Sequence, residues 1–334
     1  MKDDFIKKAR LHFKCKSEGI NDIKKCYFPD CDEKSINSHL LQKNGILNKI
    51  SKNSHLWEYT INQFKKEKYV FKRTGLNKIF SFNCFCNKHD SNLFKEIENT
   101  ELDFSNYRTN LLFTLRTLYN EIFKKQVNVK MYDCFLREDF ENYNNEKFYK
   151  KRHDENLGIE DLKLLEDKIL SDLNSTNESF IFNYRVINNI GLCMSSFFTY
   201  DTTEEIEKIE SELGKELDRY SEIFINVFPY EENAILMVAY EKIDDKKVKD
   251  YVSEFFDDLD IKLCYRKITN LVLFNCENWV VNDEFYEKCI NSVEHKFVEA
   301  TKFAIDEENK NERTNFEISF YESNFKEKFK ELVI

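Results

Sequence analysis

Four residues with soft side-chain ligands stand in two close pairs near the N-terminus of the chain. Cys26 and Cys31 form the first pair, and Cys86 and His89 form the second. Two such pairs, separated in sequence, are a common way to build a closed tetrahedral zinc site. Pro29 favours a tight turn between the first two cysteines, and the second pair is spaced by about one helical turn. The spacing therefore predicts a structural Zn²⁺ site of the Cys3His type.

Cys84 is an alternative to Cys86 as a metal ligand. Cys84 precedes Cys86 by two residues, and strand alternation would place both thiols on the same side of the chain. The sequence leaves open which of the two is the ligand. The alternative to a metal site is a set of unconnected buried thiols.

An isolated histidine, His39, lies between the two pairs. It follows Ser38 in a segment, 34–39, that we expect to be a strand, and the zinc site does not need it as a ligand. Such a histidine can remove a proton from water beside a divalent metal during phosphodiester hydrolysis. It can equally be a structural polar residue of a hairpin, and the sequence leaves both readings open.

The stretch from Cys26 to about Glu98 resembles the HNH-type nucleases of the zinc-knuckle kind. Their pattern runs from a first cysteine pair, through an acidic residue followed by histidine, to a second pair that begins a helix. The resemblance implies a small treble-clef (ββα-metal) module in which zinc is structural and a separate Mg²⁺ or Mn²⁺ is catalytic. It also resembles uncharacterised bacterial proteins with this zinc-knuckle start, and similar modules are frequent effectors in phage-defence loci.

The same resemblance implies roles for individual residues. His39 would be the general base, Asp90 and Asn92 are the candidates for the closing Asn position, and Asn44 or Asn48 for the middle one. The chain departs from the family pattern in three places. Ser38 stands where an acid is common, His89 replaces the last cysteine, and the gap from His39 to Cys86 is long. A neutral serine cannot supply a carboxylate charge to a hard metal, so Asp90 would have to supply it.

The charge of the chain is divided unevenly. The formal net charge is −10, yet residues 1–95 hold 20 Lys and Arg against 10 Asp and Glu, which leaves 31 basic and 51 acidic residues for the remainder. A basic segment beside an acidic one favours contact of the basic part with DNA or RNA. The segment 65–73 (KKEKYVFKR), which mixes basic and aromatic residues, suits either a nucleic-acid surface or an ordinary solvated hairpin.

Other function classes are excluded or disfavoured. No apolar stretch of 18 residues is present, so we expect no membrane span. The N-terminal residues lack the apolar core of a secretory signal, so we expect a cytoplasmic protein with reduced thiols. P-loop, G-x-G-x-x-G and G-x-S-x-G motifs are absent. Five scattered cysteines are expected to be small buried hydrophobic residues: Cys134, Cys193, Cys264, Cys276 and Cys289.

The hydrophobic pattern predicts an α+β fold with an antiparallel sheet. Apolar spacing predicts a helix over 104–126 and another over 159–173, with a polar loop or boundary at 143–154. Alternation predicts a hairpin within 58–74. Two strands or one long bent strand are expected at 180–200, with Gly191 near the middle. Further strands are expected at 222–227 and 234–240, a helix at 206–217, and a last strand within 312–321.

These elements lead to an expected organisation of a zinc-binding HNH-like module at 1–98, a helical connector at 99–150 and an α+β sensing or regulatory domain at 151–334. The long aromatic-rich helices offer room for a homo-oligomer interface. The first hypothesis is a metal-dependent nuclease with a role as an antiphage defence effector. The alternative is a non-catalytic, zinc-dependent protein that binds nucleic acid or protein.

Overall fold

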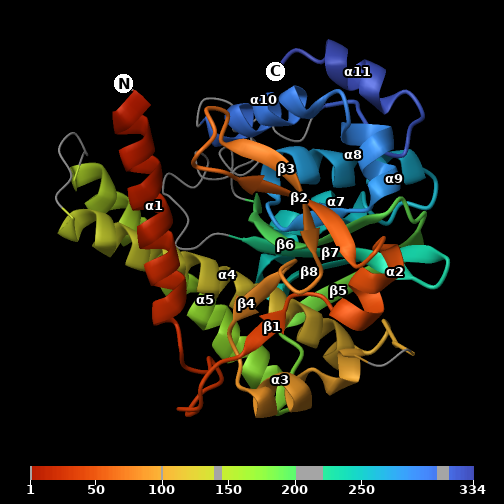
Figure 1. The fold of residues 1–334 in the computed structure, drawn as a ribbon. Coiled ribbons are helices and arrows are strands. Elements are labelled where there is room, and N and C mark those ends of the chain that lie inside the picture. The colour runs from red at the N-terminus through yellow and green to blue at the C-terminus, as the bar shows by residue number, and fades with distance from the viewer. Residues whose placement is uncertain (1, 99–100, 139–144, 201–220, 307–315) are drawn as a thin grey trace, which may run out of the picture.

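A seven-stranded antiparallel sheet forms the centre of the molecule (Figure 1). The computed structural model describes residues 2–98, 101–138, 145–200, 221–306 and 316–334. Every neighbouring pair of strands in the sheet is antiparallel, as the sequence predicts. The strand order is β3 (Tyr69–Gly75), β2 (His55–Ile61), β9 (Trp279–Val281), β6 (Leu192–Thr199), β7 (Glu222–Tyr230), β8 (Asn233–Glu241) and β5 (Phe180–Ile187).

The sheet is buried on both faces. In β7, Phe224 and Phe228 belong to one apolar core, while Ile223, Ile225 and Val227 belong to the other. Because successive side chains of a strand point to opposite faces, this division assigns one core to each face of the sheet. The first core includes the long helices α4 (Tyr107–Arg137) and α5 (Asn145–Leu173). The second core is covered by α7 (Asp245–Ser253), α8 (Ile261–Asn270), η5 (Leu271–Asn275), α9 (Asp283–Phe285), η6 (Tyr286–Ile290), α10 (Glu294–Ile305) and α11 (Phe325–Glu331).

The N-terminal part of the chain contributes to both the site and the sheet. Helix α1 (Lys2–Asp22) leads to β1 (Asn37–His39), which pairs with β4 (Ser81–Asn83) in a separate two-stranded sheet. Between these two strands the chain forms η1 (Lys43–Leu47), α2 (Asn48–Ile50) and the β2–β3 hairpin, and after them α3 (Asn87–Leu93) and η2 (Lys95–Glu98).

The β2–β3 hairpin joins the large sheet through the C-terminal part of the chain. Trp57 and Glu58 of β2 pair with Val281 and Val280 of β9. The predicted hairpin is therefore present, but the strand that joins it to the rest of the sheet, β9, comes more than 200 residues later in the sequence. The sheet thus crosses the predicted boundaries of the 1–98 and 151–334 regions.

Two predictions about the helical region were wrong. The segment 143–154, expected to be a loop, belongs to α5 from Asn145 onward, where the exposed helix has little need for apolar residues. Cys134, expected to be a free buried thiol, forms a disulfide with Cys15 that joins α4 to α1. The other four scattered cysteines are free and buried, as predicted.

The remaining predictions concern the strands at 180–200, the helix at 206–217, the last strand within 312–321 and the absence of a membrane span. Strands β5 and β6 flank Gly191, whose positive φ of 79° suits the turn between them. Residues 316–321 do not form the expected last strand, and the acidic helix predicted at 206–217 lies outside the described residues. Among the helices that are described, none combines the length and apolar character needed to cross a bilayer.

Candidate metal centre and its neighbouring histidine

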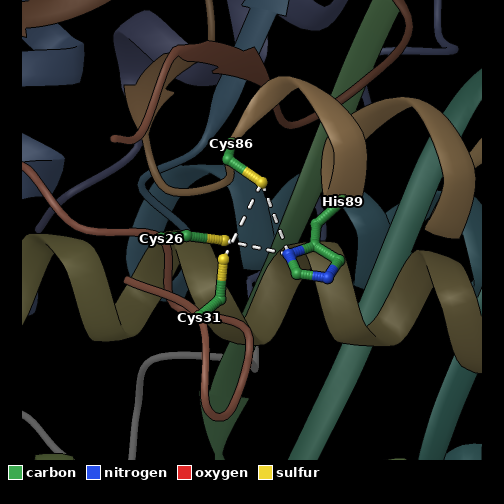
Figure 2. Close-up of side chains that lie close together, drawn as sticks. All are labelled: Cys26, Cys31, Cys86 and His89. Carbon is green, nitrogen blue, oxygen red and sulfur yellow. Dashed lines mark hydrogen bonds between the residues drawn. The ribbon is translucent and has the colours of Figure 1, made fainter. Parts of the chain in front are cut away.

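The predicted ligands converge on one point. Figure 2 shows the sulfur atoms of Cys26, Cys31 and Cys86 turned toward Nδ1 of His89. The ligand atoms of these four residues all lie within 4.8 Å of one another. Within the part of the chain that the structure describes, this is the single group of three or more such side chains that could hold a metal ion.

Local backbone structure places each pair. The first pair lies on a turn closed by hydrogen bonds from Cys26 N to Glu33 O (2.9 Å) and from Cys31 N to Phe28 O (3.2 Å). Asp30, inside the turn, has a left-handed φ of 58°, which aspartate tolerates better than most residues. Cys86 is the N-cap of α3.

The second pair lies at the start of α3. Because His89 follows Cys86 by three residues, both side chains lie on the same face of the first helical turn. Phe28 stacks on the His89 ring at a centroid distance of 4.1 Å. This contact fixes the plane of the imidazole against the knuckle that carries the first pair.

The separations suit a tetrahedral ion. Nδ1 of His89 lies 3.4 Å from the sulfurs of Cys26 and Cys86, and the sulfurs of Cys31 and Cys86 are 3.9 Å apart. With metal–sulfur and metal–nitrogen bonds of zinc length, a tetrahedron places sulfurs roughly 3.8 Å apart and sulfur and nitrogen roughly 3.6 Å apart. These three separations are therefore close to those of a closed tetrahedral site.

The electrostatics of the donors are compatible with ligation. Burial acts to raise the pKa of Cys86, but backbone amides of His89 and Lys88, together with the neighbouring thiols, outweigh it and lower the pKa. Amides at a helix N-terminus stabilise a thiolate. Burial and nearby Lys88 lower the pKa of His89, which favours the neutral ring that a metal requires. Burial raises the pKa of Cys26 to about 11, so metal binding there must displace a proton.

The choice between Cys84 and Cys86 is settled by where the strand ends. Strand β4 finishes at Asn83, so strand alternation does not extend to both cysteines. Cys84 is fully buried among apolar neighbours, and burial raises its pKa well above the usual value. Cys86 stands at the helix start and joins the cluster.

His39 occupies the adjacent two-stranded sheet. It pairs with Ser81 of β4, and its Nε2 lies 3.1 Å from the carbonyl oxygen of Leu76. Since a carbonyl can only accept, Nε2 carries the proton and Nδ1 is left as the acceptor in the neutral ring. Burial lowers the pKa of His39, and Lys43 and Arg116 lower it further, against the opposing effects of the hydrogen bond to the Leu76 carbonyl and of Asp90.

Asp90 is the sequence candidate that lies near His39. Its carboxylate is half-buried, and the pKa of Asp90 is raised by burial against the opposing influence of Arg116, Ser38 and His39. One oxygen, Oδ1, is buried and has no hydrogen-bond partner, and the same is true of Ser38 Oγ. Ser38 is close enough to affect the carboxylate, but the two groups do not meet the geometry of a hydrogen bond.

The other asparagine candidates lie on the surface. Asn92 is exposed on α3, and Asn44 and Asn48 are exposed on η1 and α2. The amide of Asn48 accepts a hydrogen bond from Ser51. None of the three has a described interaction with His39 or Asp90.

Sequence reasoning missed Arg116. This residue of α4 is 3% exposed, lies over the Phe94 ring at 4.2 Å and pairs with Glu98 at 2.5 Å. Its Nε is buried without a partner. The only signal in the sequence is a charged residue within the apolar run LLFTLRTLY, and nothing nearby in sequence indicates that it faces His39 and Asp90.

The aromatic residues of the basic hairpin face the protein. Phe71 packs edge-on against Phe297 at 5.1 Å, and Tyr69 stacks with Tyr59 at 5.9 Å. Arg73 is engaged with Asp283 at 3.0 Å. Phe71 is therefore engaged inside the protein, whereas the half-buried Tyr69 ring remains partly accessible.

Comparison with family models, with curated proteins and with solved structures gives no match for this chain.

Proposed function

We propose that this chain is a zinc-stabilised, metal-dependent nuclease of the HNH-like kind, with His39 as its general base. The observation that carries the proposal is the hydrogen bond from His39 Nε2 to the Leu76 carbonyl. It fixes the ring in one tautomer and leaves Nδ1 free to accept a proton from water. The lowered pKa of His39 keeps the ring neutral at physiological pH.

The arrangement around the histidine supports this chemistry. Strands β1 and β4 hold His39, and α3 follows directly with two of the proposed zinc ligands, Cys86 and His89. Zinc in this site is structural, because four protein ligands leave no open position for water or substrate. Its contribution is to hold α3, and hence Asp90, against the strand that carries His39.

Asp90 is the residue that would hold a catalytic Mg²⁺ or Mn²⁺. Its Oδ1 is an unpartnered carboxylate oxygen, and such cations are often bound by one or two carboxylates together with water and substrate phosphate. The cation would stabilise negative charge on the phosphate. His39 Nδ1 would receive the proton of the attacking water, and the charge of buried Arg116 would oppose protonation of His39 before substrate binds.

The test is cleavage of DNA and RNA by purified wild type and His39→Ala in the presence of Mg²⁺ or Mn²⁺. Loss of a general base lowers the rate by roughly 10²–10⁴-fold. His153→Ala, which changes an exposed histidine of α5, is the matched control and keeps full activity. Equal cleavage by His39→Ala and wild type would remove His39 from the mechanism. The proposed role in antiphage defence predicts that the same variant loses protection in a phage plating assay.

A non-catalytic, zinc-dependent binding protein is the second candidate. It is favoured by the observation that the described residues contain no group of three metal donors besides the Cys3His cluster. In that case wild type retains about one zinc per chain and binds nucleic acid or protein without cleaving any DNA or RNA substrate. The C-terminal sheet and its helices would then carry the interaction.

A further inference from the structure

A second feature is a cleft that neither His39 nor the Cys3His cluster lines, although its wall includes Ser81, the strand partner of His39. It has a volume of about 710 Å³, within the range of roughly 300–1,000 Å³ that is typical of small-molecule sites. Its walls come from α1, α4, β4, the β2–β3 hairpin, η5 with β9, and α10. It therefore lies where the N-terminal elements, the long helix and the C-terminal part of the chain meet.

The cleft is lined by aromatic rings that carry polar groups at their edges. The Tyr59 hydroxyl bonds to Thr301 at 2.9 Å, and its ring stacks with those of Tyr69 and Trp279, each at 5.9 Å. Phe123 of α4 completes this apolar wall. Flat apolar walls of this kind favour a flat, aromatic ligand.

One polar atom in the wall lacks a partner. Asn275 Oδ1 is buried from water and accepts no hydrogen bond from any described residue. The neighbouring amides differ, since Asn278 donates to Asn120 at 3.1 Å. A buried acceptor without a donor costs free energy. Because this oxygen exposes almost no surface, a ligand group with an N–H, such as the exocyclic amine of a nucleobase, would reach it only after the Asn275 side chain turns toward the cleft.

An acid and a cation are held together on the cleft wall. Lys124 contacts Glu121 at 3.0 Å and Glu277 at 2.7 Å. Lys124 lowers the pKa of Glu277 against the opposing effect of burial. The Glu277 side chain is 78% exposed, so water reaches its carboxylate. A carboxylate in this setting accepts hydrogen bonds from sugar hydroxyls.

Two exposed lysines line the cleft from different elements. Lys16 comes from α1 and Lys78 from the loop before β4. Neither forms an ion pair with any residue that the structure describes, so both are available to a phosphate. The cation at Lys124, in contrast, is already neutralised by its two glutamates.

We propose that this cleft binds a nucleotide with an amine-bearing base. The aromatic wall would contact the base, Asn275 Oδ1 would accept from its amine, Glu277 would accept from the sugar, and Lys16 and Lys78 would bind the phosphate. The ligand is either a free mononucleotide or one nucleotide of a single strand, because both present the same groups. The inference does not depend on nuclease activity.

The experiment is a titration of the purified full-length chain with AMP, adenosine and UMP. Binding is measured by calorimetry and by the fluorescence of Trp279 in the cleft wall. We expect saturable binding of AMP, weaker binding of adenosine, which lacks the phosphate, and weaker binding of UMP, which lacks the amine. Lys16→Ala lowers AMP affinity by up to about fivefold and leaves adenosine affinity unchanged. Asn275→Leu lowers AMP affinity by about fivefold to tenfold and removes the preference over UMP.

Matched controls separate the site from general charge and folding effects. Lys7→Ala removes an exposed lysine of α1 that does not line the cleft and leaves AMP binding unchanged. His39→Ala also leaves it unchanged, so failure of the nuclease proposal and failure of this one are distinguishable. The Lys16 variant, being on the surface, remains informative if Asn275→Leu does not fold.

The source of the nucleotide is decided by competition with a short single-stranded oligoadenylate. Displacement of AMP by the oligonucleotide at lower concentration identifies a strand as the source, and lack of displacement identifies a free nucleotide. Binding of the oligonucleotide alone, with the same sensitivity to Lys16→Ala, also supports the site. The proposal is overturned if neither probe binds saturably, or if binding is equal in wild type, Lys16→Ala and Asn275→Leu.

Discussion

Replacement of Cys31 by serine is the sharpest test of the metal centre. Cys31 lies on the partly exposed knuckle turn, with its sulfur 3.9 Å from that of Cys86, so the change removes one ligand with little loss of packing. Structural zinc contributes roughly 10–16 kcal/mol to the folding of small zinc-finger peptides. A quarter of that, for one ligand of four, is about 3–4 kcal/mol.

The expected shift in melting temperature follows from chain length. Unfolding entropy of roughly 2.1 cal/mol/K per residue gives about 0.7 kcal/mol/K for 334 residues. A loss of about 3–4 kcal/mol therefore lowers Tm by roughly 4–6 °C if the chain unfolds in one transition. We expect about one zinc per chain in wild type and less than half of that in Cys31→Ser after dialysis against a chelator.

The measurements are zinc content by atomic spectroscopy and Tm by calorimetry on the same samples. Cys193→Ala is the control, since Cys193 is a free, fully buried thiol of β6 outside the cluster. It costs about 1 kcal/mol of packing and leaves zinc content unchanged. Full zinc content and an unchanged Tm in Cys31→Ser, or no zinc in wild type, would refute the assignment of this site.

Three further outcomes are expected. Burial lowers the pKa of His39, and the neutral ring is the proposed base. On the acidic side, the cleavage rate should therefore decline only below pH 6.5, where the ring becomes protonated. A pH–rate profile that already declines above pH 7 contradicts this. Burial lowers the pKa of His12 to about 4, so between pH 6.5 and 4 the unfolded chain binds a proton that the folded chain does not. The free energy of unfolding should therefore decrease as pH falls through that window, and His12→Gln should flatten the dependence in urea titrations. Replacement of Cys15 and Cys134 by alanine should lower the free energy of unfolding by roughly 2–5 kcal/mol, because their disulfide closes a loop with a sequence separation of 119; equal denaturation midpoints with and without the bond would contradict this.

The metal cluster was predictable because each half of it is local. The first pair needs only a tight turn, and the second needs only the start of a helix, and both leave clear marks in spacing. The sequence could not decide between Cys84 and Cys86, because that choice depends on the residue at which β4 ends. Asp90 was found through its place beside His89, whereas Arg116 joins the site from α4 by packing between distant segments.

In the sheet, too, local elements were predictable from the sequence and long-range strand pairing was not. Alternating residues identify the β2–β3 hairpin, and Gly191 marks the turn between β5 and β6. Nothing in the pattern of β2 indicates β9 as its partner, since strand pairing between distant segments leaves no local signal. The polar N-terminal part of α5 was misread as a loop because helix periodicity is visible only where a face is buried.

The pairing of β2 with β9 also sets an order of events during synthesis on the ribosome. Glu58 can pair with Val280 only after Val280 has been synthesised. At about 5–20 residues per second, synthesis of the intervening chain takes roughly 10–45 s. Cys86 and His89 are made within the first third of the chain, so the proposed zinc ion can close the β1–β4 sheet early in that interval. The segment that carries the hairpin would then be closed at its base, while the edge of β2 stays open to association with other strands until β9 is made.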